Sequence, residues 1–82
     1  MNQDLKLVET VEETWDCQEY LYDYKGYTIR EFYYHEEDCN HHNAIIYKDG
    51  KDIKQFNWDG CMIKAMEYID SLVGVENESN TN

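Results

Sequence analysis

The chain has 82 residues and carries 18 acidic against 7 basic side chains, a formal net charge of −11. This length allows one domain, and the charge disfavours binding to nucleic acid or to an anionic membrane. Hydrophobic residues make up 41% of the chain and aromatic residues 15%, which excludes a disordered acidic tail and predicts a folded core.

Residues 1–16 have a pattern that suits two structures. The residues at helical spacing are Leu5, Val8, Glu12 and Trp15, with Val11 beside them. This spacing favours a short amphipathic helix. The apolar run from Leu5 to Val8 equally suits the start of an edge strand, which is the alternative.

Residues 19–34 predict a β-hairpin around Lys25-Gly26, because tyrosines alternate before this turn and β-forming residues follow it. A two-residue turn would place Tyr24 opposite Tyr27 and Tyr22 opposite Ile29. The face with these four side chains is expected to be the core. The opposite face carries Glu19, Leu21, Asp23, Thr28, Arg30, Phe32 and Tyr34.

Residues 35–42 lack periodicity and are expected to form a polar loop. A second hairpin follows, with strands over residues 43–47 and 52–56. Its turn, Lys48-Asp49-Gly50-Lys51, contains Asp-Gly, the strongest short-range hairpin signal. Asp-Gly suits both a two-residue turn and a three-residue loop with a glycine bulge, so the sequence leaves open whether Ile45 or Ile46 faces inward.

A helix is expected over residues 60–73, with Asp59 as its N-cap and Gly74 as its C-cap. Its apolar side holds Met62, Ala65, Met66, Ile69, Leu72 and Val73. The elements together predict an α+β fold, an antiparallel sheet of two β-hairpins packed by this C-terminal helix, with a short N-terminal helix or edge strand. Residues 1–74 are expected to form the single domain and residues 75–82 a flexible tail.

The three cysteines are Cys17, Cys39 and Cys61, an odd number without regular spacing. No basic and apolar leader opens the chain, so free thiols in a reducing cytoplasm are expected. No apolar run approaches the ~20 residues that cross a bilayer, and no membrane association is expected.

One cluster, His35, Cys39, His41 and His42, has ligand chemistry suited to zinc. It is a weak candidate, because adjacent histidines rarely bind one metal and no second cysteine pair is present. We therefore expect no cofactor, and a small zinc-responsive module is an alternative function. Catalysis is not expected, because the acidic residues flanking Cys39 would raise the pKa of its thiol and no phosphate-binding loop occurs.

The acidic residues are concentrated in the first half of the chain. Residues 1–38 hold 11 acidic and 3 basic side chains, whereas residues 39–82 hold 7 and 4. The excess can serve solubility alone, or it can bind a basic protein surface, since carboxylates ~7 Å apart on a strand approach the charge density of a phosphate backbone. The expected partner-binding residues are Asp16, Glu19, Asp23, Glu36, Glu37 and Asp38, with Phe32 and Tyr34 as aromatic anchors.

The chain resembles the small acidic proteins that phages encode against host defences, the anti-CRISPR proteins and other DNA mimics. The resemblance rests on the acidic excess and on the hairpin and helix around Lys48-Asp49-Gly50-Lys51 and Met62-Ile63-Lys64-Ala65-Met66. These families share no motif, so no functional residue is carried over. The resemblance implies an inhibitor that occupies the basic nucleic-acid-binding surface of a host enzyme in the host cytoplasm. The sequence leaves open whether it is a monomer or a homodimer. A homodimeric structural adaptor is a further alternative.

Overall fold

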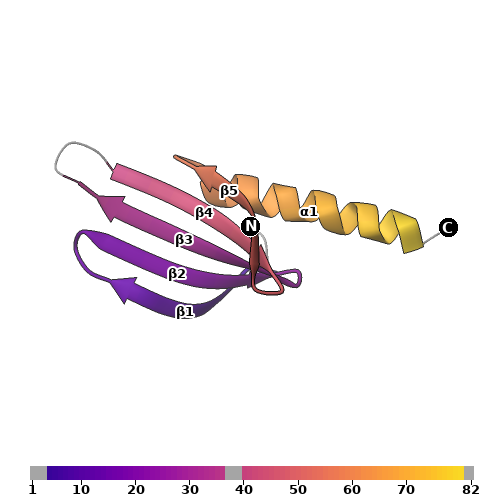
Figure 1. Ribbon diagram of the computed structural model, residues 1–82, viewed down its shortest axis with the longest axis horizontal. Coiled ribbons are helices and arrows are strands. Elements are labelled where there is room, and N and C mark those ends of the chain that lie inside the picture. Colours follow the sequence, from indigo (N-terminus) through magenta and orange to yellow (C-terminus); the bar gives the residue numbers. More distant parts are fainter. Residues whose placement is uncertain (1–3, 37–39, 81–82) are drawn as a thin grey trace.

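The computed structural model describes residues 4–36 and 40–80, which form five β-strands and one α-helix (Figure 1). The strands are antiparallel and lie in chain order across one sheet. The bounds are β1 Lys6–Glu13, β2 Cys17–Tyr24, β3 Tyr27–His35, β4 Asn40–Lys48, β5 Lys51–Asn57 and α1 Cys61–Asn80. The expected α+β class is confirmed, but the sheet has a fifth strand in addition to the four of two hairpins.

This fifth strand is β1, so the N-terminal helix expected from the spacing is wrong and the edge strand is found. The pairing of β1 with β2 shifts register between Leu7 and Glu9 and again between Thr10 and Glu12. Each shift adds one residue to β1, so residues on the same face recur every three positions instead of every two. A three-residue recurrence resembles the period of a helix, which explains the error.

The first hairpin has the expected register. Tyr24 pairs with Tyr27 and Tyr22 pairs with Ile29. The turn residues Lys25 and Gly26 both have positive φ, 50° and 88°, as a two-residue hairpin turn of the favoured twist requires. Strand β3 then pairs with β4 from Thr28 to His35. The polar loop expected over residues 35–42 is therefore shorter, because His35 lies in β3 and His41 and His42 lie in β4.

The second hairpin adopts the two-residue turn, with Asp49 and Gly50 at φ 54° and 81°. A register shift between Ile46 and Tyr47 leaves Ile53 as the additional residue of β5. Ile46 is fully buried, and Ile45, its neighbour in the strand, lies on the other face. The structure thereby settles the alternative that the turn sequence left open.

Helix α1 begins at Cys61, and the Gly60 carbonyl accepts the hydrogen bond of Lys64 N–H. Gly60 therefore holds the N-cap position expected for Asp59. The helix continues through Gly74 to Asn80, because a glycine within a helix costs only about 1 kcal/mol. The helix end expected at residue 73 is thus extended.

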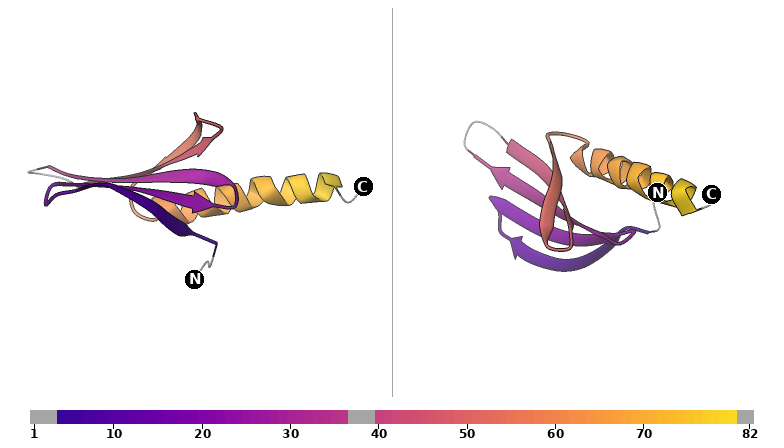
Figure 2. Two further views of the ribbon diagram at one scale, coloured as in Figure 1. Left: turned by 90° about the horizontal axis from the view of Figure 1, so that it is seen from below. Right: turned by 45° about the vertical axis from the view of Figure 1, so that its right-hand side comes forward.

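Helix α1 lies along one face of the sheet (Figure 2), and the core lies between the two. The helix buries Cys61, Ala65 and Ile69, which recur every four residues on one side. The strands contribute Tyr24, Tyr27, Ile29, Ala44 and Ile46. Because the core is confined to this side, the opposite face of the sheet has no covering layer within the described residues (Figure 2).

A polar contact joins the middle of α1 to the first hairpin. Asp70 Oδ1 accepts hydrogen bonds from Tyr24 Oη and Lys25 Nζ, both at 2.7 Å. The Lys25 ammonium, with the Tyr24 hydroxyl, lowers the pKa of Asp70. Since the side chains of Lys25 and Asp70 are 31% and 44% exposed, this ion pair orients the helix more than it stabilises the fold.

Candidate protein-binding face

The face of the sheet opposite α1, termed the uncovered face, carries most of the acidic strand residues. Residues directly opposite in an antiparallel pair point to the same side, so the register assigns every paired strand residue to a face. Among the strand residues, the charged members of the uncovered face are Lys6, Glu9, Glu12, Glu19, Asp23, Arg30 and Asp52. Those of the helix side are Glu13, Glu31, Lys48, Lys51 and Lys54. The alternation of the strands thus separates five carboxylates from three of the lysines.

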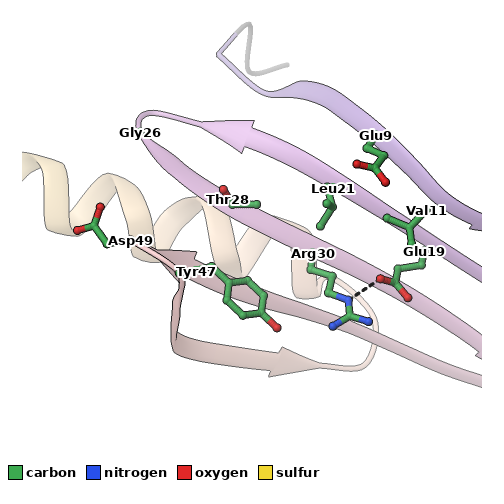
Figure 3. Close-up of a pocket in the computed structure, with 10 residues that line it drawn as sticks. Glu9, Val11, Glu19, Leu21, Gly26, Thr28, Arg30, Tyr47 and Asp49 are labelled. Carbon is green, nitrogen blue, oxygen red and sulfur yellow. Dashed lines mark ion pairs between the residues drawn. The ribbon is translucent and has the colours of Figure 1, made fainter.

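The uncovered face is hollowed into an open depression of about 610 Å³ (Figure 3). The turn between β4 and β5 forms one wall, with Asp49 and Gly50, and β1 forms the other, with Glu9 and Val11. The remaining lining residues are Glu19, Leu21, Gly26, Thr28, Arg30 and Tyr47. The depression is therefore a trough with acidic side chains at both rims.

An ion pair lies on the floor of this trough. Arg30 Nε is 2.7 Å from Glu19 Oε2, and the Glu19 side chain is only 11% exposed (Figure 3). The contact with the Glu19 carboxylate raises the pKa of Arg30. Glu19 is consequently neutralised from within the sheet, and the rim carboxylates determine the charge that a partner meets.

Carboxylates also surround Cys17, at the start of β2. Glu12 lies directly opposite Glu19 in the β1–β2 pair, and both are close enough to Cys17 to affect its thiol. Burial, followed by the charges of Glu12, Asp16 and Glu19, raises the pKa of Cys17. This environment disfavours the thiolate form of Cys17.

Replacing Glu12 with glutamine should lower the pKa of the Cys17 thiol and accelerate its alkylation by iodoacetamide at pH 8, because one of the acidic neighbours is removed. The measurement is the rate of alkylation against pH in a Cys39→Ser background, followed by intact-mass spectrometry. Glu67→Gln, on the exposed side of α1, is the matched control and should leave the rate unchanged. An unchanged rate for Glu12→Gln would mean that the carboxylates do not cluster around Cys17.

An aromatic row, defined as Phe32, Tyr34, His41 and Trp58, crosses one end of the uncovered face. The centroids of successive rings are 6.3, 6.0 and 6.2 Å apart. Glu36 Oε2 lies 3.4 Å from His41 Nε2 and adds a carboxylate beside the row. Trp58 ends the row and has an exposed fraction of 65%.

The structure brings together only part of the partner-binding set expected from the sequence. Glu19, Asp23, Phe32 and Tyr34 share the uncovered face, and Glu19 pairs directly with Phe32. Glu36 joins them through His41. Asp16 lies in the β1–β2 turn at the same end, where its side chain accepts a hydrogen bond from Thr14, while Asp23 lies at the other end of β2. Glu37 and Asp38 lie outside the described residues.

Three members of this face, Glu9, Glu12 and Trp58, were not predicted from the sequence. Arg30 was expected on this face and lies there, but its ion pair with Glu19 was not predicted. Glu9 and Glu12 were missed because β1 was first assigned as a helix, which gives no sheet face. The β-branched residues of β1, Val8, Thr10 and Val11, are the signal that could have placed them. For Trp58 the sequence offers a weaker signal: a large aromatic residue in the connection just before Asp59-Gly60 and the helix.

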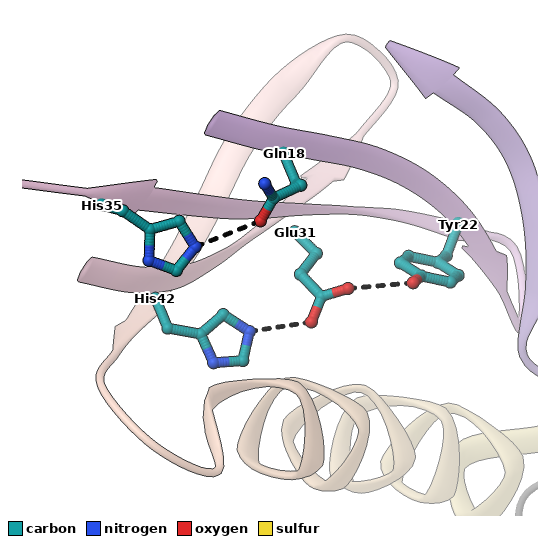
Figure 4. Close-up of polar contacts among 5 residues, drawn as sticks. All are labelled: Gln18, Tyr22, Glu31, His35 and His42. Atoms are coloured by element: carbon teal, nitrogen blue, oxygen red, sulfur yellow. Dashed lines mark hydrogen bonds and ion pairs between the residues drawn. The ribbon is translucent and has the colours of Figure 1, made fainter. Parts of the chain in front are cut away.

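The helix side holds a separate polar network (Figure 4). Glu31 lies at its centre, accepting Tyr22 Oη–H at 2.9 Å and lying 2.8 Å from His42 Nε2. The Tyr33 ring stacks on His42 with centroids 3.8 Å apart. His35 Nε2 lies 3.3 Å from Gln18 Oε1 (Figure 4). These side chains satisfy one another, so the network is structural.

The zinc candidates are divided between the two faces. His35 and His42 lie on the helix side, whereas His41 lies on the uncovered face, because adjacent strand residues point in opposite directions. Cys39 lies outside the described residues. Within the described part of the chain, no three His, Cys, Asp or Glu side chains converge as a metal site requires.

Cys61 is the thiol of the core. It lies at the first position of α1 and is fully buried. Burial, with the charge of Glu31, raises the pKa of Cys61, and this outweighs the lowering by helical backbone N–H groups. An inaccessible, protonated thiol is suited to packing and not to nucleophilic attack.

Comparisons with protein families, with curated proteins and with solved structures give no match for this chain. Over residues 4–36 and 40–80, no helix combines the length and the apolarity that crossing a membrane requires. The fold and the face together define a small α+β protein with an acidic, uncovered sheet surface.

Proposed function

We propose that this protein is an inhibitor that binds the basic nucleic-acid-binding surface of a host nucleic-acid enzyme or defence complex, in the manner of a DNA mimic. The observation that supports this most is the distribution of charge. The uncovered face carries five carboxylates, Glu9, Glu12, Glu19, Asp23 and Asp52, against the two basic side chains Lys6 and Arg30, while three lysines lie on the helix side. A face of this kind attracts Arg and Lys side chains and repels nucleic acid. The protein would act stoichiometrically, without catalysis, in the host cytoplasm.

The position of two glutamates argues against solubility as the sole reason for the charge. Glu12 and Glu19 are directly opposite in neighbouring strands, where like charges destabilise a sheet. Arg30 offsets part of this repulsion through its ion pair with Glu19. Carboxylates spread over loops and helix would give the same solubility without this cost.

The spacing of the sheet also suits the proposal. Neighbouring strands lie about 4.8 Å apart, and carboxylates along a strand lie about 7 Å apart. Glu9, Glu12 and Asp23 therefore form a two-dimensional array of carboxylates, with Lys6 directly opposite Asp23. A basic channel shaped for nucleic acid would meet carboxylates at this spacing.

The test is displacement of labelled DNA from a nuclease or CRISPR effector, with association rates measured between about 50 and 300 mM salt. We expect association to slow steeply as salt rises, because long-range attraction accelerates the encounter. Glu9→Lys and Glu12→Lys should each slow association about tenfold. Glu67→Lys on α1 makes the same change in net charge and should have a much smaller effect.

Three outcomes would contradict the proposal. An association rate that does not change with salt would remove the electrostatic mechanism. Equal losses for Glu12→Lys and Glu67→Lys would mean that total charge, and not this face, governs binding. Binding that leaves the labelled DNA in place would put the contact outside the nucleic-acid surface.

A further inference from the structure

We infer that the aromatic row is the docking point for an arginine side chain of the partner, with the guanidinium stacked on the exposed indole of Trp58. This inference rests on the proposed function, because it assigns the residue that a basic partner contributes. Its first support is continuity: the row runs across β3, β4 and the β5–α1 connection, with rings about 6 Å apart. Single exposed aromatic residues are common, but a connected row is suited to contact.

The backbone of Trp58 is the second, independent support. Its φ is 77°, in the left-handed region that aromatic residues rarely adopt. Its N–H donates to the His42 carbonyl at 2.6 Å, which holds the connection beside β4. Since the side chain is 65% exposed, burial does not compensate the unfavourable conformation. Such strain is typical of residues retained for a contact.

The charge around the row favours a cation as the occupant. Glu36 lies against His41, and the carboxylates of the uncovered face share the same side of the sheet. Tryptophan is the ring that attracts cations most strongly. Arginine fits better than lysine, because its planar guanidinium stacks on a ring while its remaining N–H groups reach a carboxylate such as Glu36.

The direct test is fluorescence titration of a Trp15→Phe variant, in which Trp58 is the remaining tryptophan. The probe is a short capped peptide with one arginine, and its control replaces arginine with neutral citrulline of the same shape. We expect a saturable change in Trp58 emission with the arginine peptide and binding about fivefold weaker with citrulline. Equal responses to the two peptides would overturn the inference.

The second test compares two exposed tryptophans in binding to the nuclease or effector. Trp58→Gly should weaken binding about 30-fold, as loss of an interface anchor does. It should also keep or raise the midpoint of thermal unfolding, because glycine adopts the left-handed conformation freely. Trp15→Ala, from an exposed tryptophan outside the row, should change binding less than twofold. A lower midpoint for Trp58→Gly would assign Trp58 a structural role and overturn the inference.

The two proposals can fail separately. If Glu12→Lys slows association but Trp58→Gly does not weaken binding, the acidic face is the interface and the row is not its anchor. If no basic partner is found and the arginine peptide still binds at Trp58, the row recognises arginine and the proposed inhibitor role fails.

Discussion

Replacing Ile29 with alanine is expected to lower the free energy of unfolding by about 2–5 kcal/mol. Ile29 is fully buried in β3, the middle strand, and it pairs with the equally buried Ile46. Truncation removes three carbons from a thin core, and the neighbours on two adjacent strands can close only part of the cavity. A domain of this size is stable by about 4–12 kcal/mol in total, so the loss is a large share.

Urea unfolding followed by circular dichroism measures this effect. Ile53→Ala is the matched control, because Ile53 is the additional residue of β5 and its exposed fraction is 41%. We expect it to change the free energy of unfolding by less than about 1 kcal/mol. Similar losses at the two positions would place the core elsewhere than between α1 and the strands.

The second large effect is expected at His42. Replacing it with alanine should destabilise the protein by about 2–3 kcal/mol, because Glu31 loses a hydrogen-bond partner while its side chain is only 12% exposed. The stacking of Tyr33 on the imidazole is lost as well. Of the two contacts that Figure 4 draws to Glu31, the hydrogen bond from Tyr22 would then remain.

His41→Ala gives a control of the same residue type at the next position. Its side chain is 37% exposed and lies on the uncovered face, so its loss should cost less than about 1 kcal/mol. Thermal unfolding of both variants measures the difference. If His41→Ala were as destabilising as His42→Ala, the structural network would not be confined to the helix side.

The sequence predicted the first hairpin well because its signals are local. Lys25-Gly26 sets the turn, and alternating tyrosines set the face, so the pairing of Tyr22 with Ile29 follows. The strand conformation of β1 could not be predicted from such local signals. Its two register shifts become visible only when β1 is paired with β2, and they remove the alternation by which a strand is recognised.

The candidate site was predicted in part for the same reason. Phe32 and Tyr34 were placed on the correct face, because the first hairpin fixes them relative to Glu19. The ion pair of Glu19 with Arg30 depends on side-chain conformations, which hydrophobic periodicity does not report. The contact of His41 with Trp58 joins residues from β4 and from the connection before α1, whose proximity depends on the pairing of β4 with β5.

The irregular edge formed by β1 has a consequence for how copies of this protein meet at high concentration. An unpaired strand is a template on which further strands can grow into fibres, and a small sheet with exposed apolar residues is vulnerable to this. Leu7, Val8 and Val11 are 56%, 58% and 45% exposed on that edge. The extra residues at Val8 and Val11 break the run of N–H and C=O groups that an incoming strand would need, and Glu9 and Glu12 repel it. The strand that displays the acidic surface is thus also shaped to disfavour the addition of further strands at this edge.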